Sequence, residues 1–551
     1  EGPDGAKWKA ATEKEMQKYI LYETFSADPT KIKQRFDTGA KVVQLVDVLD
    51  IKTLANGAYD KHKVIFCANG KGEHKYNAHR NPPSPVVDTA AHSMILALSV
   101  LEGYTNFVAD CETAYLNVKE DQPRLVRVSQ SFMDTFVSLG FDNPNNSLIL
   151  AVQTGLYGYD DTGKNYQKLV GQVLTKVGFN QCPDDMCIWK YTEKDMIIIA
   201  SIHVDDFHFT TNNVTRFLHI FKQIQLYFAF NKFNEMETFL GLSYVKTPTG
   251  INVGTEALIN VAARAVNVTN APPLYHPWKC KDEITPETSS PEEIAEYKSS
   301  IDYSSVLGLA SYVCQRARWE LQFHTNSLSS KQKDPNVNDY ELLVRLIRYL
   351  YTTKQYRRCM ERPEYDAQGN PFNPRGGRYK LIGMSDADYA SRKTDRKSIS
   401  GSIIYLSHST LSNSNGIPIT ARTNAQQTIA QSSNESELVA GNALAKRLVF
   451  LNNILKFIAP NPTPAKLFMD NEGAISIAHG VGRTKRSKHI EVKHFYMREL
   501  IKYNKLTLHS INTHDNVADA MTKSLGKIKF RKFRESLGIK DPNESTSPYD
   551  H

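Results

Sequence analysis

The chain has 551 residues, a formal net charge of +8 and seven cysteines. This length exceeds what one hydrophobic core serves, so three or four domains are expected, and the mild positive charge suits a polyanionic partner without requiring one. The sequence contains no apolar run long enough to span a bilayer and no secretory signal, and its odd cysteine count without a Cys-x-x-Cys motif argues against a disulfide framework or zinc ribbon.

The N-terminal part predicts a helix, a β-hairpin and a second helix. An apolar pattern at helical spacing near the start predicts the first helix. Residues 63–67 and 74–80 flank a Gly-Lys-Gly turn, and we expect them to pair as a hairpin. Residues 84–101 carry an apolar stripe that predicts a core helix, capped by Asp88 or Thr89.

Three carboxylates stand at the ends of apolar runs. Residues 196–211 read as two short strands joined by a tight turn that carries Asp205 and Asp206, and an upstream apolar run ends at Asp110. Adjacent carboxylates repel each other at neutral pH, and a divalent cation removes that repulsion. Together the three acids predict a two-cation site for in-line phosphoryl transfer, with a solvated Asp-Asp turn as the alternative.

A second set of carboxylates lies in the C-terminal third. Two predicted strands end at Asp386 and Asp470, a long helix carries Glu437 near its start, and the last predicted helix carries Asp519. Glu435 is the rival to Glu437. A carboxylate cluster on a mixed sheet is what a two-metal nuclease needs, and four unrelated strand-end and capping acids are the alternative.

The order of these motifs resembles one known family. An Asp-x-x-x-Ala-Tyr segment begins at Asp110, Val-Asp-Asp follows at 204–206, and Ser-Asp-Ala-Asp and Ala-Asp-Ala-Met-Thr-Lys stand at 385–388 and 518–523. They resemble the reverse transcriptase and ribonuclease H of copia-type long-terminal-repeat retrotransposons, over nearly the whole chain up to residue 537. The resemblance implies an α+β fold: a right-hand polymerase with fingers, palm and thumb, followed by an α/β ribonuclease H-like domain with a mixed sheet.

The resemblance also implies roles for individual residues, with two Mg²⁺ ions at each of two active sites. The implied catalytic and metal-binding residues are Asp110, Asp205, Asp206, Asp386, Glu437, Asp470 and Asp519. The implied nucleotide-binding residues are Lys75, Arg80 and Tyr115, the last as a steric gate that selects deoxynucleotides or, alternatively, as a core aromatic. The implied nucleic-acid-binding residues are Arg345, Arg348, Lys485, Lys488 and His489, for which a solvated surface is the alternative.

Four positions depart from the family pattern. Asn77 stands where an Arg is expected, Asp160 and Asp161 replace a Lys and a Gln, and His203 replaces a Tyr or Phe. Two acids beside a triphosphate site would repel the substrate. These departures motivate a second hypothesis, a domesticated or degenerate copia-like protein that binds nucleic acid with weak or no polymerisation. A third is a ribonuclease H whose polymerase half serves as a scaffold.

The resemblance further implies domains, partners and location. The expected domains are fingers and palm 1–249, linker and helical thumb 250–353, linker 354–378, ribonuclease H 379–525 and C-terminal tail 526–551. The expected partners are an RNA template, a DNA primer, RNA–DNA hybrid and deoxynucleotide triphosphates, with a tRNA primer and a homodimer as further expectations, and no membrane. We expect a cytoplasmic virus-like particle, with nuclear entry as a further expectation. Because the chain begins at Glu1, we expect an expression fragment or a segment of a longer polyprotein.

Overall fold

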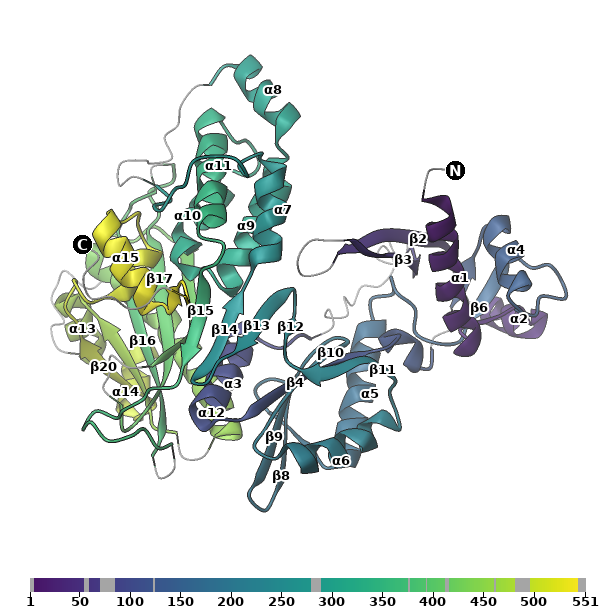
Figure 1. Ribbon diagram of the computed structural model, residues 1–551, viewed down its shortest axis with the longest axis horizontal. Coiled ribbons are helices and arrows are strands. Elements are labelled where there is room, and N and C mark those ends of the chain that lie inside the picture. The colour runs from purple at the N-terminus through teal and green to yellow at the C-terminus, as the bar shows by residue number, and fades with distance from the viewer. Residues whose placement is uncertain are drawn as a thin grey trace. The chain divides into compact units, whose positions relative to one another are not determined.

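The computed structural model describes residues 4–53, 59–69, 85–121, 124–278, 289–374, 377–392, 394–411, 416–459, 462–480 and 496–543. Contacts divide the chain into two compact units. The first comprises Glu1–Val87 and Asn106–Glu235, and the second comprises Asp88–Thr105 and Met236–His551. Figure 1 labels their helices and strands. Both units mix helices with sheets, as the α+β prediction requires.

The first unit contains two sheets, each with its own hydrophobic core. Its elements are α1 (Gly5–Leu21), β1 (Phe25–Ser26), α2 (Pro29–Asp37), β2 (Val42–Thr53), β3 (Tyr59–Ala68), β4 (Thr105–Cys111), the 3-10 helix η2 (Ala114–Asn117), β5 (Leu125–Arg127), α4 (Gln130–Ser138), β6 (Ile149–Val152), α5 (Thr162–Val177), β7 (Asn180–Gln181), β8 (Ile188–Glu193), β9 (Met196–His203), β10 (Asp206–Thr211), α6 (Val214–Gln225) and β11 (Phe230–Glu235).

The first sheet has the order β1-β6-β5-β2-β3, and α1 packs on it through Met16 and Tyr19. Its long β2–β3 hairpin differs from the predicted one. Strand β3 includes the predicted residues 63–67 but pairs with β2, which we did not predict, and the predicted partner, residues 74–80, lies outside the described residues.

The second sheet has the order β11-β4-β10-β9-β8-β7, with α5 and α6 packed against it. The predicted hairpin at 196–211 is confirmed, because β9 and β10 pair antiparallel with Asp206 opposite His203. Every second residue of these strands faces the core beneath the two helices, where Ile198, Ile202, Phe207 and Phe209 are buried. This sheet carries the first predicted carboxylate group.

The second unit begins with the predicted core helix and ends near the C-terminus. Its elements are α3 (Thr89–Glu102), β12 (Thr238–Phe239), β13 (Leu242–Lys246), β14 (Gly250–Gly254), α7 (Glu256–Ala265), α8 (Pro291–Ser300), α9 (Tyr303–Arg316), η3 (Trp319–Leu321), α10 (Gln322–Ser329), α11 (Val337–Thr352), β15 (Arg357–Glu361), β16 (Tyr379–Asp388), β17 (Ile399–His408), β18 (Ile417–Ala425), α12 (Ser433–Ile458), β19 (Ala465–Met469), α13 (Glu472–His479), α14 (Tyr496–Lys502), β20 (Leu506–Ser510), η6 (Val517–Met521), α15 (Lys527–Ser536) and β21 (Ile539–Lys540).

One of the two five-stranded sheets of this unit is mixed, as predicted for a ribonuclease H-like domain. Its order is β18-β17-β16-β19-β20, with β18, β17 and β16 antiparallel and β19 parallel to both β16 and β20. The long helix α12 packs across β16 (Figure 1), and Gly383 allows this approach because a Cβ there would lie 2.9 Å from a methyl of Leu448.

Helix α3 also packs against this sheet. It contacts β18 and α12, and its capping residue Asp88 accepts hydrogen bonds from the backbone amides of Ala90 and Ala91 while forming an ion pair with Arg447. The predicted helix and its Asp88 cap are therefore confirmed. The sequence pattern gave no sign that this helix would join the second compact unit.

Two segments that we predicted to be connections are structured, and these predictions were wrong. The predicted linker 354–378 contains β15, which pairs with β14 and β21. The predicted tail 526–551 contains α15 and β21, whose Phe530, Phe533 and Ile539 are buried in the core of the second unit. The polar composition of the tail misled the prediction, because α15 carries five basic residues in addition to an apolar face at helical spacing.

Among the described residues, none of the helices combines the length and apolar character needed to cross a membrane.

Candidate active sites

The first carboxylate group gathers at one edge of the second sheet. Strand β4 ends just after Asp110 and lies beside β10, which begins at Asp206. The amide of Cys111 donates to the carbonyl of Asp205 at 2.8 Å, so the turn and the end of β4 are joined directly. Val204 adopts φ +61°, a left-handed conformation that is strained for a β-branched residue and produces the tight turn.

The pKa values of Asp205 and Asp206 are both raised. Burial raises the pKa of Asp206 to about 7, and the charges of Asp205 and Asp110 add to the effect. Burial also raises the pKa of Asp205, again with a contribution from Asp110. Asn231 on β11 donates to Asp110 at 3.3 Å. Three mutually repelling carboxyl groups in a half-buried position are stabilised by a bound cation.

Tyr115, the predicted gate residue, lies next to this group. It stands in η2, and its ring centroid is 4.6 Å from that of Tyr157. Burial raises the pKa of Tyr115, and the charge of Asp205 contributes. Gly155 permits this packing, because a Cβ there would lie 2.6 Å from the carbonyl oxygen of Tyr115. The tyrosine is therefore half-buried beside the carboxylates.

Asp161, which stands where the family has a Gln, forms an ion pair with Arg124. Arg124 donates to Asp161 and to Glu120, both at 2.6 Å, and its guanidinium lies 4.0 Å from the ring centroid of Tyr159. The side chain of Glu120 is only 2% exposed. Asp161 thus belongs to a partly buried ion-pair network, and Arg124 offsets the repulsion that we expected it to exert on a triphosphate.

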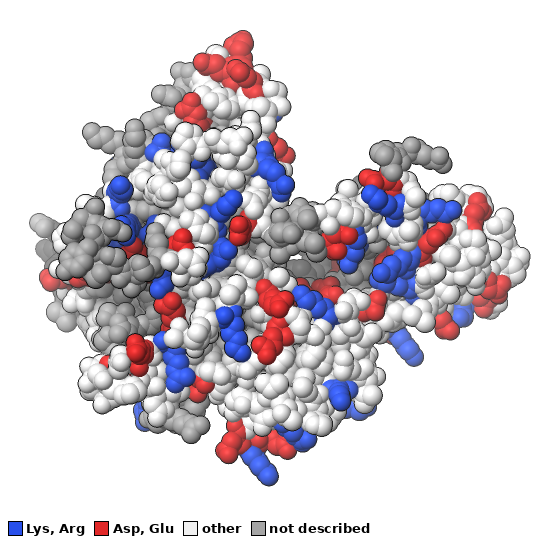
Figure 2. All heavy atoms as spheres, in the orientation of Figure 1, with Lys and Arg blue, Asp and Glu red and all other residues white. Residues whose placement is uncertain are grey.

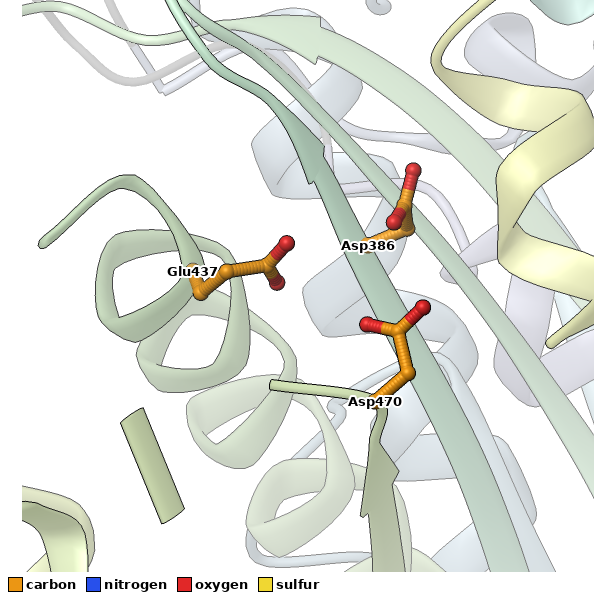
Figure 3. Close-up of side chains that lie close together, drawn as sticks. All are labelled: Asp386, Glu437 and Asp470. Atoms are coloured by element: carbon orange, nitrogen blue, oxygen red, sulfur yellow. The ribbon is translucent and has the colours of Figure 1, made fainter. Parts of the chain in front are cut away.

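The second carboxylate group contains an acidic trio formed by Asp386, Glu437 and Asp470. One carboxylate oxygen from each residue lies within 4.8 Å of the others. Figure 3 shows the three carboxylates turned toward a common point, Glu437 from a helix and the two aspartates from neighbouring strands. Within the described ranges, this is the only group of three such ligand residues that meets this distance; the first group does not.

Sheet register explains how the trio forms. Strands β16 and β19 are parallel, and Met384 pairs with Phe468, so Asp386 and Asp470 each follow this pair by two residues at the same sheet edge. Ser432 caps α12 by accepting from the amide of Glu435, and the helix then presents Glu437 toward β16. The amide of Ala387 donates to Oε1 of Glu437 at 3.2 Å. Glu437, rather than its rival Glu435, is the third member.

Burial dominates the electrostatics of the trio. It raises the pKa of Glu437 to about 9, with added effects from the charges of Asp386 and Asp470. It also raises the pKa of Asp386 to about 6, against which a hydrogen bond from Thr522 acts. Oε2 of Glu437 has no hydrogen-bond partner among the described residues, although the residue is only 6% exposed. This oxygen and its two neighbours are suited to hold a divalent cation.

The predicted fourth ligand, Asp519, is not part of the trio, and its role as a metal ligand stays a prediction. Asp519 lies on η6, where it forms ion pairs with Lys523 and Lys529. Element η6 is nevertheless fixed beside Asp386, because Asn516 donates to the carbonyl of Ser385 at 3.0 Å.

Gly401 and Thr522 are positioning residues that sequence reasoning missed. Gly401 lies opposite Asp386 on β17, and a Cβ there would lie 2.7 Å from the carbonyl oxygen of Ala518. The absent side chain lets η6 approach the sheet. Thr522 donates to Asp386 and to the carbonyl of Asp519. The Ala-Asp-Ala-Met-Thr-Lys motif was the available signal for Thr522.

Of the residues predicted to bind nucleotide or nucleic acid, only some lie in the described part of the chain. Arg345 and Arg348 donate to the backbone carbonyls of Pro277 and Pro272, each at 2.6 Å, so both hold the preceding segment. Their contact with nucleic acid stays a prediction. On the face in Figure 2, basic and acidic side chains are interspersed. The other predicted contacts lie outside the described residues: Lys75, Arg80, Lys485, Lys488 and His489, together with the departure Asn77.

Comparison with known proteins identifies the class of the first part. Residues 39–280 match the family described as reverse transcriptase (RNA-dependent DNA polymerase). This part of the chain is therefore similar to reverse transcriptases.

Relatives extend the likeness beyond this part. The chain is 22% identical over 486 residues to the retrovirus-related Pol polyprotein from transposon RE1 of Arabidopsis thaliana, covering 88% of this chain and 31% of that protein. It is 22% identical over 542 residues to the transposon Ty1-DR6 Gag-Pol polyprotein of Saccharomyces cerevisiae, covering 94% and 28%. The resemblance to copia-type retrotransposon reverse transcriptases is thus confirmed, and the chain spans about a third of the length of these relatives.

Among solved structures, the chain is similar to the foamy viral protease–reverse transcriptase in complex with RNA/DNA hybrid. The likeness has a TM-score of 0.45 and 12% sequence identity, and it covers 86% of this chain and 51% of that chain.

Proposed function

We propose that this chain copies RNA and DNA templates into DNA and cleaves the RNA strand of RNA–DNA hybrids, for replication of a retrotransposon. One observation carries the proposal: carboxylates far apart in sequence gather into two separate groups, each at the ends of neighbouring strands. Such groups recruit divalent cations for in-line reactions at phosphorus. The reverse transcriptase match supports the polymerase half.

In the polymerase site, Asp110, Asp205 and Asp206 are the residues that would hold Mg²⁺. Two Mg²⁺ ions, when bound, stabilise the charge on the attacking and leaving oxygens of phosphoryl transfer. The carboxylates must be ionised for this role, and the raised pKa of Asp206 means that cation binding and proton release are linked there. The reaction joins the primer 3′-hydroxyl oxygen to the nucleotide α-phosphorus and releases pyrophosphate. Tyr115, beside Asp205, excludes a 2′-hydroxyl from the sugar site.

In the nuclease site, the acidic trio would hold Mg²⁺ for hydrolysis of an RNA phosphodiester. The orphaned Oε2 of Glu437 fits such a ligand, because a buried carboxylate oxygen without a donor is costly. Thr522 donates to one oxygen of Asp386, and the amide of Ala387 donates to one oxygen of Glu437, so two of the three carboxylates are oriented by the protein itself.

The proposal includes the partners and place that the family resemblance implies. They are an RNA template, a DNA primer, RNA–DNA hybrid and deoxynucleotide triphosphates, with a tRNA primer and a homodimer, in a cytoplasmic virus-like particle with nuclear entry. Relatives described as transposon Pol and Gag-Pol polyproteins support this setting.

Primer extension tests the polymerase half. The wild-type chain, given a primed RNA template, Mg²⁺ and four deoxynucleotides, is expected to extend the primer, and Asp205→Asn is expected to abolish extension. Tight binding of the primed template with no incorporation would instead favour the degenerate binding protein. Cleavage of a hybrid without extension would favour the nuclease with a polymerase scaffold. The Arg124–Asp161 ion pair supports the active polymerase, because it offsets one of the departures that motivated the degenerate alternative.

A further inference from the structure

Helix α3 belongs to the second compact unit, although the chain on either side of it belongs to the first. Its N-terminal cap, Asp88, forms an ion pair with Arg447 of α12. In its last turn, Glu102 accepts a hydrogen bond from the hydroxyl of Tyr379, the first residue of β16. Each end of α3 is therefore fastened to an element that also carries a member of the acidic trio.

The middle of α3 is held as well. Every residue from Ala90 to Leu101 is buried. The guanidinium of Arg358 on β15 donates to Oγ of Ser93 at 3.2 Å, and β18 packs along the helix. Because closely packed interiors leave no room for one element to shift alone, α3 keeps a fixed position on the mixed sheet.

The polypeptide leads from both ends of α3 to the strands of the first carboxylate group. After the C-terminal cap Gly103, a single residue precedes β4, which carries Asp110. Before the helix, the amide of Val87 donates to the carbonyl of Ile202 on β9, three residues ahead of Asp205. Connections this short carry a displacement of the helix to the strands, because one residue spans at most about 3.6 Å.

We propose that α3 makes DNA synthesis depend on the part of the chain that carries the acidic trio, with Arg447 and Tyr379 as positioning residues for Asp110 and Asp205. The inference rests on the proposed polymerase function. When the ends of the helix are released, the strands that carry the polymerase carboxylates are held less precisely, and a misplacement of about 1 Å can slow a reaction that needs aligned groups by roughly a hundredfold. The trio keeps its own register through the pairing of β16 with β19, so cleavage does not depend on α3 in the same way.

A double variant of the full chain that releases both ends of the helix tests this proposal. Arg447→Met removes the cation from Asp88, and Tyr379→Phe removes the hydroxyl from Glu102. The rate of primer extension is expected to fall by at least about tenfold, while cleavage of an RNA–DNA hybrid stays within about twofold of the wild type. The Mg²⁺ concentration for half-maximal extension is expected to rise with the Kd for the primed template unchanged, a split that a general loss of stability would not produce.

A matched double variant makes similar changes away from the helix. Lys456→Met removes an exposed cation elsewhere on α12. Tyr405→Phe removes a buried hydroxyl from the neighbouring strand β17, where it donates to the carbonyl of Ser536 rather than to α3. Both activities of this control are expected to stay within about twofold of the wild type, and a loss of extension equal to that of the first variant would overturn the proposal.

The remaining outcomes separate the inference from the proposed function. Unchanged extension in the first double variant, or a parallel loss of extension and cleavage while it stays folded, would overturn the role of α3 and leave the polymerase function intact. If that variant fails to fold, Asp88→Asn decides, because asparagine keeps the helix cap but loses the charge. Its extension is expected to fall about threefold with cleavage unchanged, and unchanged extension would overturn the proposal. Absence of extension by the wild type would overturn both the inference and the proposed polymerase function.

Discussion

Replacing Glu437 with glutamine is expected to stabilise the metal-free fold while destroying the acidic trio. Burial raises the pKa of Glu437 from its ordinary 4.5 to about 9, so at pH 7 the folded protein holds a proton that the unfolded chain has released. Each pH unit above 4.5 then destabilises the wild type by about 1.4 kcal/mol, and about 3 kcal/mol is lost by pH 7. Glutamine keeps the shape and never ionises, so Glu437→Gln avoids this loss.

The assay is thermal unfolding of both proteins without divalent ions between pH 4.5 and 9. The gain of Glu437→Gln is expected to be near zero at pH 4.5 and to grow with pH, reaching about 3 kcal/mol or roughly 6 °C at pH 7. Adding Mg²⁺ is expected to reduce the difference in stability between the two proteins, because the ion stabilises only the wild type. Glu435→Gln, which removes a carboxylate from the same helix but outside the trio, is the control. A variant that is less stable than the wild type at every pH would refute the reasoning.

Three further predictions concern the surroundings of the sites. Gly401→Ala is expected to lower the free energy of unfolding by about 1–3 kcal/mol and to slow hybrid cleavage, because its Cβ would clash with η6. Gly308→Ala in α9, where a Cβ meets open space, is expected to be neutral or stabilising. Unfolding and cleavage assays test this, and equal effects of the two substitutions would contradict it. Arg124→Met is expected to destabilise the chain by about 3 kcal/mol, because it leaves two partly buried carboxylates without a partner, whereas Arg216→Met at an exposed pair is expected to have little effect; denaturant unfolding measures both, and equal effects would contradict this. The shift of the unfolding midpoint by Mg²⁺ is expected to be larger at pH 8 than at pH 6, since Glu437 must release its proton to bind; a smaller shift at pH 8 would count against the trio as the metal site.

Local sequence signals predicted the elements that carry the carboxylates. Two short apolar runs flanking a tight turn predicted the β9–β10 hairpin, and a long helix carrying Glu437 near its start was predicted as well. The parallel register that brings Asp386 and Asp470 together followed only from the family resemblance, because no local pattern encodes which distant strands pair.

What the sequence did not predict depends on packing between distant segments. Helix α3 reads as an ordinary core helix, yet its partners are β18 and α12, more than three hundred residues away. The many basic residues of α15 gave no sign in the sequence that its two phenylalanines are buried in the core of the second unit. The ion pair of Asp519 with Lys529 requires η6 and α15 to pack together, so the motif alone could not show that this pair forms.

The most direct test of two independent active sites is one reaction that follows both strands. A labelled DNA primer on a labelled RNA template reports extension and RNA cleavage together in the presence of Mg²⁺. We expect Asp206→Asn to lose extension but retain cleavage, and Glu437→Gln to lose cleavage but retain extension. Loss of both activities from either single substitution, in a protein that still folds, would contradict it.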